Sequence, residues 1–155
     1  MEGAETSFEA YEANGKGLNY IKAGKYDKAV EAFTKAIRFS KNHSPSYAGR
    51  GIAYMNLSEY EKAIKDFDTA IKKRSPKLGL YYKLRGEAYS AMKEYNKAVE
   101  DFDRAIKIEP EMLEAYFERG NAFRNLDKYS EAIADYTKVI DLDNSFLQAY
   151  NNRGR

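Results

Sequence analysis

Glycine recurs along this 155-residue chain at a nearly constant interval, and no other feature constrains the fold as strongly. Gly17, Gly51, Gly86, Gly120 and Gly154 follow one another at intervals of 34 or 35 residues. Self-similarity at such a period indicates an array of small structural units, each of which buries its apolar face against its neighbours. The chain is therefore expected to be a repeat protein.

Other residues keep step with the glycine, as the third unit illustrates. After Gly86 come Tyr89 and Tyr95, and then Ala98 and Phe102 at the spacing of one helical face. Each unit thus contains two helical patterns separated by a short polar break. The small residues allow the helices to approach closely, and the aromatic residues fill the space between them. The same kinds of residue fill these positions in the other units: Tyr20, Tyr26, Ala29 and Phe33; Tyr54, Tyr60, Ala63 and Phe67; Phe123, Tyr129, Ala132 and Tyr136.

This pattern resembles the tetratricopeptide repeat over nearly the whole chain. The resemblance implies an all-α protein, a right-handed α-solenoid of antiparallel helix pairs with four units and the first helix of a fifth. The single array 1–155 would divide into units at approximately 10–43, 44–78, 79–112 and 113–146, with a partial unit at 147–155. The chain departs from the family at the position before the glycine, where Leu is common and where it has Lys16, Arg50, Arg85, Arg119 and Arg153.

The unit boundaries follow from local signals. Residues 1–9 are expected to be a polar lead-in, followed by helices at roughly Phe8–Ala23 and Tyr26–Ser40. Ser44-Pro45 is interpreted as an N-cap followed by proline at the first helical position, and Ser75-Pro76 as the same device in the third unit. Because the fifth unit is incomplete, we expect a fragment of a longer array or an end that pairs with another copy.

Composition narrows the function classes. The net charge is only +2, with 26 basic and 24 acidic residues, which gives no strong electrostatic field to attract nucleic acid or an anionic membrane. There is no cysteine, and no apolar run approaches the roughly 20 residues of a membrane span. The default expectation is a cytoplasmic protein. The only histidine, His43, is interpreted as a solvated loop residue, and no motif indicates a catalytic, metal or cofactor site.

Binding to a protein is the function that the pattern favours. Solenoids bind partners on their concave face, and the resemblance implies that the first helix of each unit lines it. The leading hypothesis is an adaptor or scaffold that holds a peptide or helix in this groove, with asparagines pairing to peptide backbone and Phe117 or Ile52 taking apolar groups. The candidate groove residues are Asn14, Leu18, Lys22, Ala48, Ile52, Asn56, Lys83, Glu87, Ser90, Phe117, Asn121, Arg124, Asn125, Asn151 and Asn152.

Two alternatives stay open. The array can self-assemble, as a homo-oligomer paired through its open C-terminal end, or it can be the accessory fragment of a larger protein or enzyme. One family use is not expected. Chaperone-binding members hold an acidic C-terminal tail with a clamp of Lys, Asn and basic residues, but in no register does this chain supply the required cations. The register that begins at Lys83 continues with Glu87, Glu118, Gln148 and Asn152.

Overall fold

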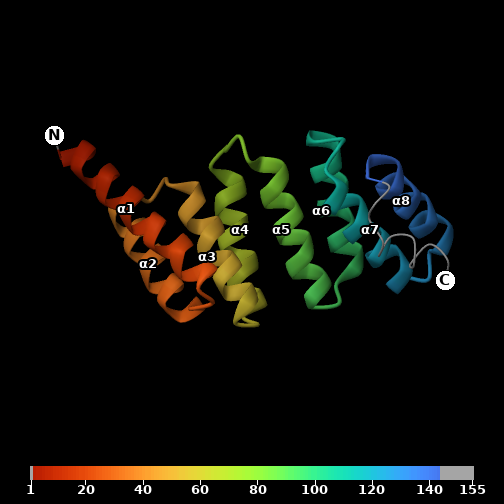
Figure 1. The fold of residues 1–155 in the computed structure, drawn as a ribbon, viewed down its shortest axis with the longest axis horizontal. Helices are drawn as coiled ribbons and strands as arrows, with labels where there is room; N and C mark the ends of the chain where they lie inside the picture. The colour runs from red at the N-terminus through yellow and green to blue at the C-terminus, as the bar shows by residue number, and fades with distance from the viewer. Residues whose placement is uncertain (1, 144–155) are drawn as a thin grey trace. The chain divides into compact units, whose positions relative to one another are not determined.

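The computed structural model describes residues 2–143, with side chains from Ser7 onward. All regular structure in this part of the chain is α-helix, which confirms the all-α prediction. The candidate residues Asn151 and Asn152, the fifth unit and the C-terminal end proposed for self-assembly lie outside the described residues. The described helices are α1 (Glu2–Lys22), α2 (Tyr26–Phe39), α3 (Ser44–Asn56), α4 (Tyr60–Lys72), α5 (Leu78–Ala91), α6 (Tyr95–Ile108), α7 (Leu113–Asn125) and α8 (Tyr129–Leu142) (Figure 1).

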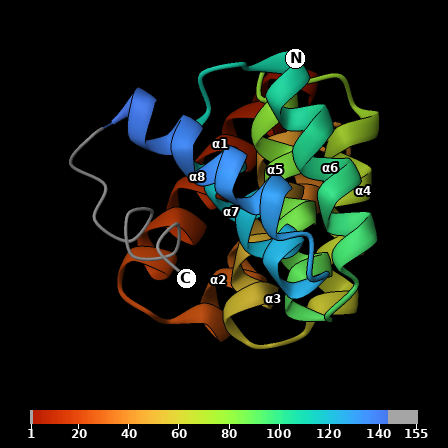
Figure 2. The same cartoon turned by 90° about the vertical axis from the view of Figure 1, so that its right-hand side faces the viewer.

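The helices form two compact bodies, Met1–Ser75 and Pro76–Arg155. The N-terminal body contains α1–α4 and the C-terminal body α5–α8, drawn from red to yellow and from green to blue in Figure 1. Within each body every helix packs against the next one along the chain. The last pair, α7 and α8, faces the viewer in Figure 2. Each body therefore contains two helix pairs. In each pair, the helix that comes earlier in the chain is called the first helix and the other the second helix.

The repeated glycines that the structure describes lie where the two helices of a pair cross; they are Gly17, Gly51, Gly86 and Gly120. A Cβ atom added to Gly86 would lie 2.7 Å from Cε1 of Phe102, and one added to Gly120 would lie 2.7 Å from Cε1 of Tyr136. Both rings are buried. Because any side chain at these glycines would overlap an aromatic ring, the packing role predicted for them is confirmed.

The turn inside each pair has one conformation throughout. In each turn the residue before the last one has a positive φ. This residue is a glycine only in the turn between α1 and α2. The next backbone N–H donates to the carbonyl oxygen five residues earlier, for example from Glu94 to Tyr89 at 2.9 Å. This is the Schellman arrangement, which satisfies carbonyl groups at a helix C-terminus. The positive-φ residues of the four turns are Gly24, Ser58, Lys93 and Asp127.

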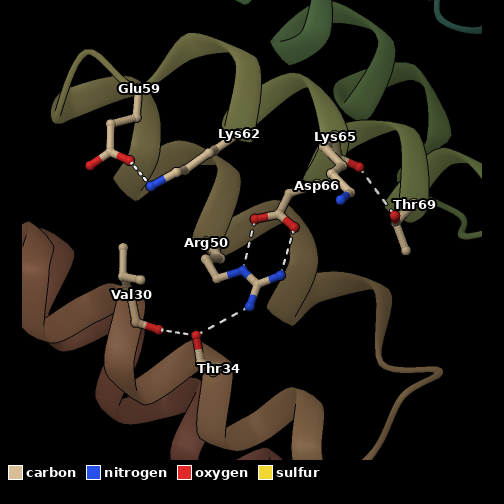
Figure 3. A network of polar contacts seen from close by, with 8 residues as sticks. All are labelled: Val30, Thr34, Arg50, Glu59, Lys62, Lys65, Asp66 and Thr69. Carbon is tan, nitrogen blue, oxygen red and sulfur yellow. Dashed lines mark hydrogen bonds and ion pairs between the residues drawn. The ribbon is translucent and has the colours of Figure 1, made fainter.

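Arginine residues connect the helices through buried ion pairs. Arg50 on α3 donates from Nε and Nη2 to Oδ2 and Oδ1 of Asp66 on α4, at 2.8 Å each (Figure 3). The Asp66 side chain is only 6% exposed. The guanidinium fork matches the carboxylate geometrically, so the pairing satisfies a charge that would be costly to bury alone. The same bidentate pairs join Arg85 to Asp101 and Arg119 to Asp135.

Two of these arginines, Arg50 and Arg119, also reach back to the preceding second helix. Nη1 of Arg50 donates to Oγ1 of Thr34 on α2 at 3.1 Å, as Figure 3 shows. Nη1 of Arg119 donates to Oδ1 of Asp103 on α6 at 2.8 Å. Asp135 beside it raises the pKa of the Arg119 guanidinium, so the arginine stays charged. One side chain thus links three helices of the stack.

Three helix starts differ from the sequence-based expectation. α1 begins at Glu2, so most of the predicted lead-in is helical, in keeping with its content of Ala and Glu. His43 is the N-cap of α3 and Ser44 its first residue, one residue earlier than predicted. α5 begins at Leu78, two residues beyond Pro76, so Ser75-Pro76 precedes this helix and is not its N-cap and first residue.

Candidate functional site

The first helices of each body lie next to one another and form a common face. α1 contacts α3 and α5 contacts α7, whereas second helices of neighbouring repeats show no comparable packing within either body. The first helices therefore approach more closely than the second helices, as on the inner side of a curved stack. We call these faces the first-helix surfaces of the N-terminal body (α1 and α3) and of the C-terminal body (α5 and α7).

Part of the candidate set in the N-terminal body is buried. Asn14 on α1 and Ala48 on α3 are 9% and 5% exposed. Oγ of the fully buried Ser46 donates to Oδ1 of Asn14 at 3.1 Å, and Nδ1 of His43 lies 2.6 Å from the same Oγ. His43 is therefore a half-buried member of a polar network rather than the solvated loop residue that was expected. Burial also lowers the pKa of its imidazole.

The remaining candidates of this body are accessible. Leu18, Lys22 and Asn56 are exposed, and Ile52 is half-buried. The Asn56 side chain donates from Nδ2 to the backbone oxygen of Ile52 at 2.9 Å, which holds the amide against its own helix. This surface therefore presents apolar groups with a few polar groups beside them.

The C-terminal body brings an aromatic and amide cluster together. Phe117 on α7 lies against Tyr136 on α8, with ring centroids 6.0 Å apart. The Tyr136 hydroxyl donates to Oδ1 of Asn121 at 2.6 Å, and Asn125 donates to the Asn121 backbone oxygen at 2.8 Å. Burial raises the pKa of the Tyr136 phenol. Asn121 is thus half-buried and oriented by its neighbours, while Asn125 is exposed and Arg124 is half-buried.

Next to this cluster lies a group of charged side chains. Nζ of Lys83 lies 3.2 Å from Oε1 of Glu87 on the same helix, α5. Glu118 on α7 is half-buried, and burial together with the charge of Glu87 raises the pKa of its carboxyl. Ser90, one turn beyond Glu87, has a buried Oγ with no hydrogen-bond partner among the described residues. Both helices of the surface contribute to this group.

Residues 2–143 contain neither a metal-binding cluster nor a membrane-spanning helix. No cluster of three or more histidine, aspartate or glutamate side chains there has an arrangement suited to a metal ion. None of the helices in this range combines the length and apolar character that crossing a bilayer requires.

Comparison with known families identifies the repeat. Sequence profiles described as "Tetratricopeptide repeat" match residues 10–43, 44–75, 80–112 and 113–146. The chain belongs to the tetratricopeptide repeat (TPR) family. The antiparallel helix pairs and the glycine-aromatic crossings are those of a TPR α-solenoid, as the sequence predicted. No curated protein sequence matches the chain.

Solved TPR structures share the fold. MamA 41-end from Desulfovibrio magneticus RS-1 is 23% identical with a TM-score of 0.85, covering 94% of this chain and 82% of that one. The first TPR of Spaghetti (RPAP3), solved with the HSP90 peptide SRMEEVD, is 28% identical with a TM-score of 0.75, covering 78% and 95%. YrrB, described as a TPR protein with an unusual peptide-binding site, is 20% identical with a TM-score of 0.76, covering 92% and 73%.

Glu118 was not among the candidate groove residues. Its repeat position is held by Gly49 in the second unit, where an added Cβ would lie 2.5 Å from the Phe33 ring of the preceding second helix. The position therefore faces the junction between repeats, which a sequence pattern alone does not reveal. An acidic residue where other units have glycine or leucine was the available signal.

Proposed function

We propose that this TPR protein is a non-catalytic interaction module, an adaptor or scaffold that binds a peptide or helix of a partner protein on its first-helix surfaces. The observation that carries the proposal is the composition of the C-terminal surface. There Phe117 offers an apolar contact, Asn125 an exposed amide, and Arg124 and Glu118 charged groups, all on α7. Side chains of these kinds recognise both the backbone and the side chains of a peptide.

Two structurally similar TPR proteins support this proposal. The RPAP3 domain was solved with a bound peptide, and YrrB is described by its peptide-binding site. Both share the stacked helix pairs, but their low identity to this chain transfers no partner. The partner of this chain has to be recognised by the side chains on its own surface.

Affinity capture from lysate with matched variants tests the proposal. The bait is the chain, beside a variant with Phe117, Asn121 and Arg124 changed to alanine and a milder variant with only Arg124 and Asn125 changed. The matched control changes Lys97 and Glu100, which are exposed on α6 of the same body. We expect a partner that both surface variants lose and the α6 control retains. Capture that is equal for all baits would contradict the proposal.

Self-assembly is separated from this function by solution mass. A mass that grows with concentration, with no partner dependent on the first-helix surfaces, would favour an array that pairs with itself. A constant mass together with a surface-dependent partner supports the adaptor.

A further inference from the structure

The group of charged side chains on the C-terminal first-helix surface has one more negative than positive charge. It contains two carboxylates, Glu87 and Glu118, and one ammonium, Lys83. The ammonium is already engaged, since Lys83 Nζ lies 3.2 Å from Glu87 Oε1 and both side chains are mostly buried, at 15% and 28% exposure. Glu118 makes no hydrogen bond or ion pair with any residue that the structure describes. The unsatisfied charge is therefore that of Glu118.

Burial makes the unpaired charge of Glu118 energetically unfavourable. A carboxylate that is partly removed from water loses hydration, and without a hydrogen-bond or ionic partner nothing replaces it. Glu87 adds repulsion, which the attraction of Lys83 only partly offsets, and the pKa of Glu118 is raised accordingly. A fold that served stability alone would place an uncharged residue here, as it does with Gly49 and Leu84 at the equivalent positions. Groups that are unfavourable in the free protein are often those that bind a ligand.

A second polar group without a hydrogen-bond partner in the described part of the chain lies on α5, on the side of that helix that carries Lys83 and Glu87. Lys83, Glu87 and Ser90 follow one another at helical spacing, so they share one side of the helix. The Oγ atom of Ser90 is excluded from solvent and has no partner among the described residues. The two helices of the surface thus each contribute a polar group whose bonding is incomplete.

We propose that Glu118, together with Glu87, binds a basic side chain, Lys or Arg, of the partner peptide. This inference rests on the proposed function and names the chemistry of its ligand. A cation placed between α5 and α7 completes the charge balance of the group and gives the Glu118 carboxylate a charge-assisted hydrogen bond. The overall charge of the protein does not account for binding of a basic peptide, because the chain itself carries a net charge of +2.

The test uses synthetic peptide sublibraries with identical uncharged, degenerate flanks and a central residue fixed as Arg, Lys, Leu or Glu. The full chain is immobilised, and the retained fraction of each sublibrary is measured. We expect the Arg and Lys sublibraries to be retained about tenfold more strongly than the Leu sublibrary, as for one charge-assisted bond. Glu118→Gln, which keeps the side-chain shape, should bring this ratio close to one, and Glu87→Gln should lower it. Glu114→Gln, at an exposed acid on the same helix, should leave it unchanged.

The outcomes separate this inference from the proposed function. Retention that requires Phe117 but does not depend on the central residue would overturn the inference and leave the proposed function standing. A preference for basic peptides that survives both Glu118→Gln and Glu87→Gln would also overturn it, because the cation would then bind elsewhere. If no sublibrary is retained in a Phe117-dependent manner, both proposals fail.

Discussion

Arg50 and Asp66 face each other from the first and second helices of one repeat and form two parallel hydrogen bonds of 2.8 Å. The same pair recurs in the next two repeats, and its members are always 16 positions apart in the sequence. The first repeat has Lys16 and Ala32 at the two positions, so it lacks the pair. In the repeats that have it, the pair is buried, and its opposite charges join the two helices of the repeat.

Breaking one of these pairs should destabilise the protein strongly. The Asp101 side chain is 1% exposed and accepts from both Arg85 and Arg104. Asp101→Ala leaves the guanidinium of Arg85 without its carboxylate, and we expect a loss of about 3 kcal/mol in the free energy of unfolding. Urea denaturation followed by circular dichroism measures this loss.

Two further variants show whether the pairing is the cause. Glu100→Ala, at an exposed acid on the same helix, should change the stability little. Arg85→Met combined with Asp101→Leu removes both charges at similar volume and should recover most of the stability. A single Asp101→Ala variant as stable as the wild type would disprove the role of the pair.

The glycines of the array should respond to alanine in opposite directions. At Gly86 a Cβ would lie 2.7 Å from the Phe102 ring, so Gly86→Ala should cost roughly 1–3 kcal/mol by overpacking. At Gly15 the added Cβ would meet no neighbouring helix or packed side chain within 4 Å, so Gly15→Ala should gain roughly 0.5–1 kcal/mol from helix propensity. Thermal and urea denaturation of the two variants test this contrast. Equal effects would show that the glycines do not act through packing at the crossing.

Glu118 should make the stability depend on pH. Its pKa is raised in the folded state, so the folded protein binds the proton more tightly than the unfolded chain. Glu118 therefore costs stability at neutral pH, and Glu118→Gln should be more stable than the wild type at pH 7. This advantage should shrink as the pH falls through the raised pKa and disappear below the ordinary value of 4.5. Urea denaturation across this range, with Glu114→Gln as control, measures it; a constant difference would contradict the argument.

The acidic chaperone peptide should not bind specifically. The RPAP3 domain was solved with the HSP90 peptide SRMEEVD, which contains two glutamates and ends in aspartate. On this chain the charged group contains two carboxylates, Glu87 and Glu118, and one ammonium, and like charges oppose such a peptide. Isothermal titration calorimetry should detect no specific complex. Micromolar affinity that is lost when first-helix residues are changed would disprove this expectation.

The sequence predicted the architecture because the residues that pack the helices recur at the same positions of each repeat. Gly86 and Phe102 have counterparts in every complete repeat, so one crossing explains all of them. The Arg–Asp pairs were not predicted, although arginine and aspartate recur together 16 residues apart, because each residue taken singly is typical of a solvated helix. The start of α5 was misplaced because proline is compatible with a turn as well as with a helix start.

The candidate site was less predictable for a physical reason. Helical periodicity places Asn14 on the same side of its helix as Leu18, but it does not show that α3 covers the first and leaves the second exposed. Likewise, the environment of Glu118 depends on how closely α5 approaches α7. Burial between repeats is a property of the stack, and a single repeat does not determine it.

Site-specific crosslinking tests the central proposal most directly. A benzophenone side chain is introduced at Asn125, exposed on the first-helix surface of the C-terminal body, or at Glu100, exposed on α6 of the same body. After irradiation in lysate, mass spectrometry identifies the crosslinked protein. We predict that one partner crosslinks at position 125, is displaced by excess unlabelled chain, and does not crosslink at position 100. Crosslinks from position 100 instead, or only to a second copy of the chain, would contradict an adaptor that binds partners on its first helices.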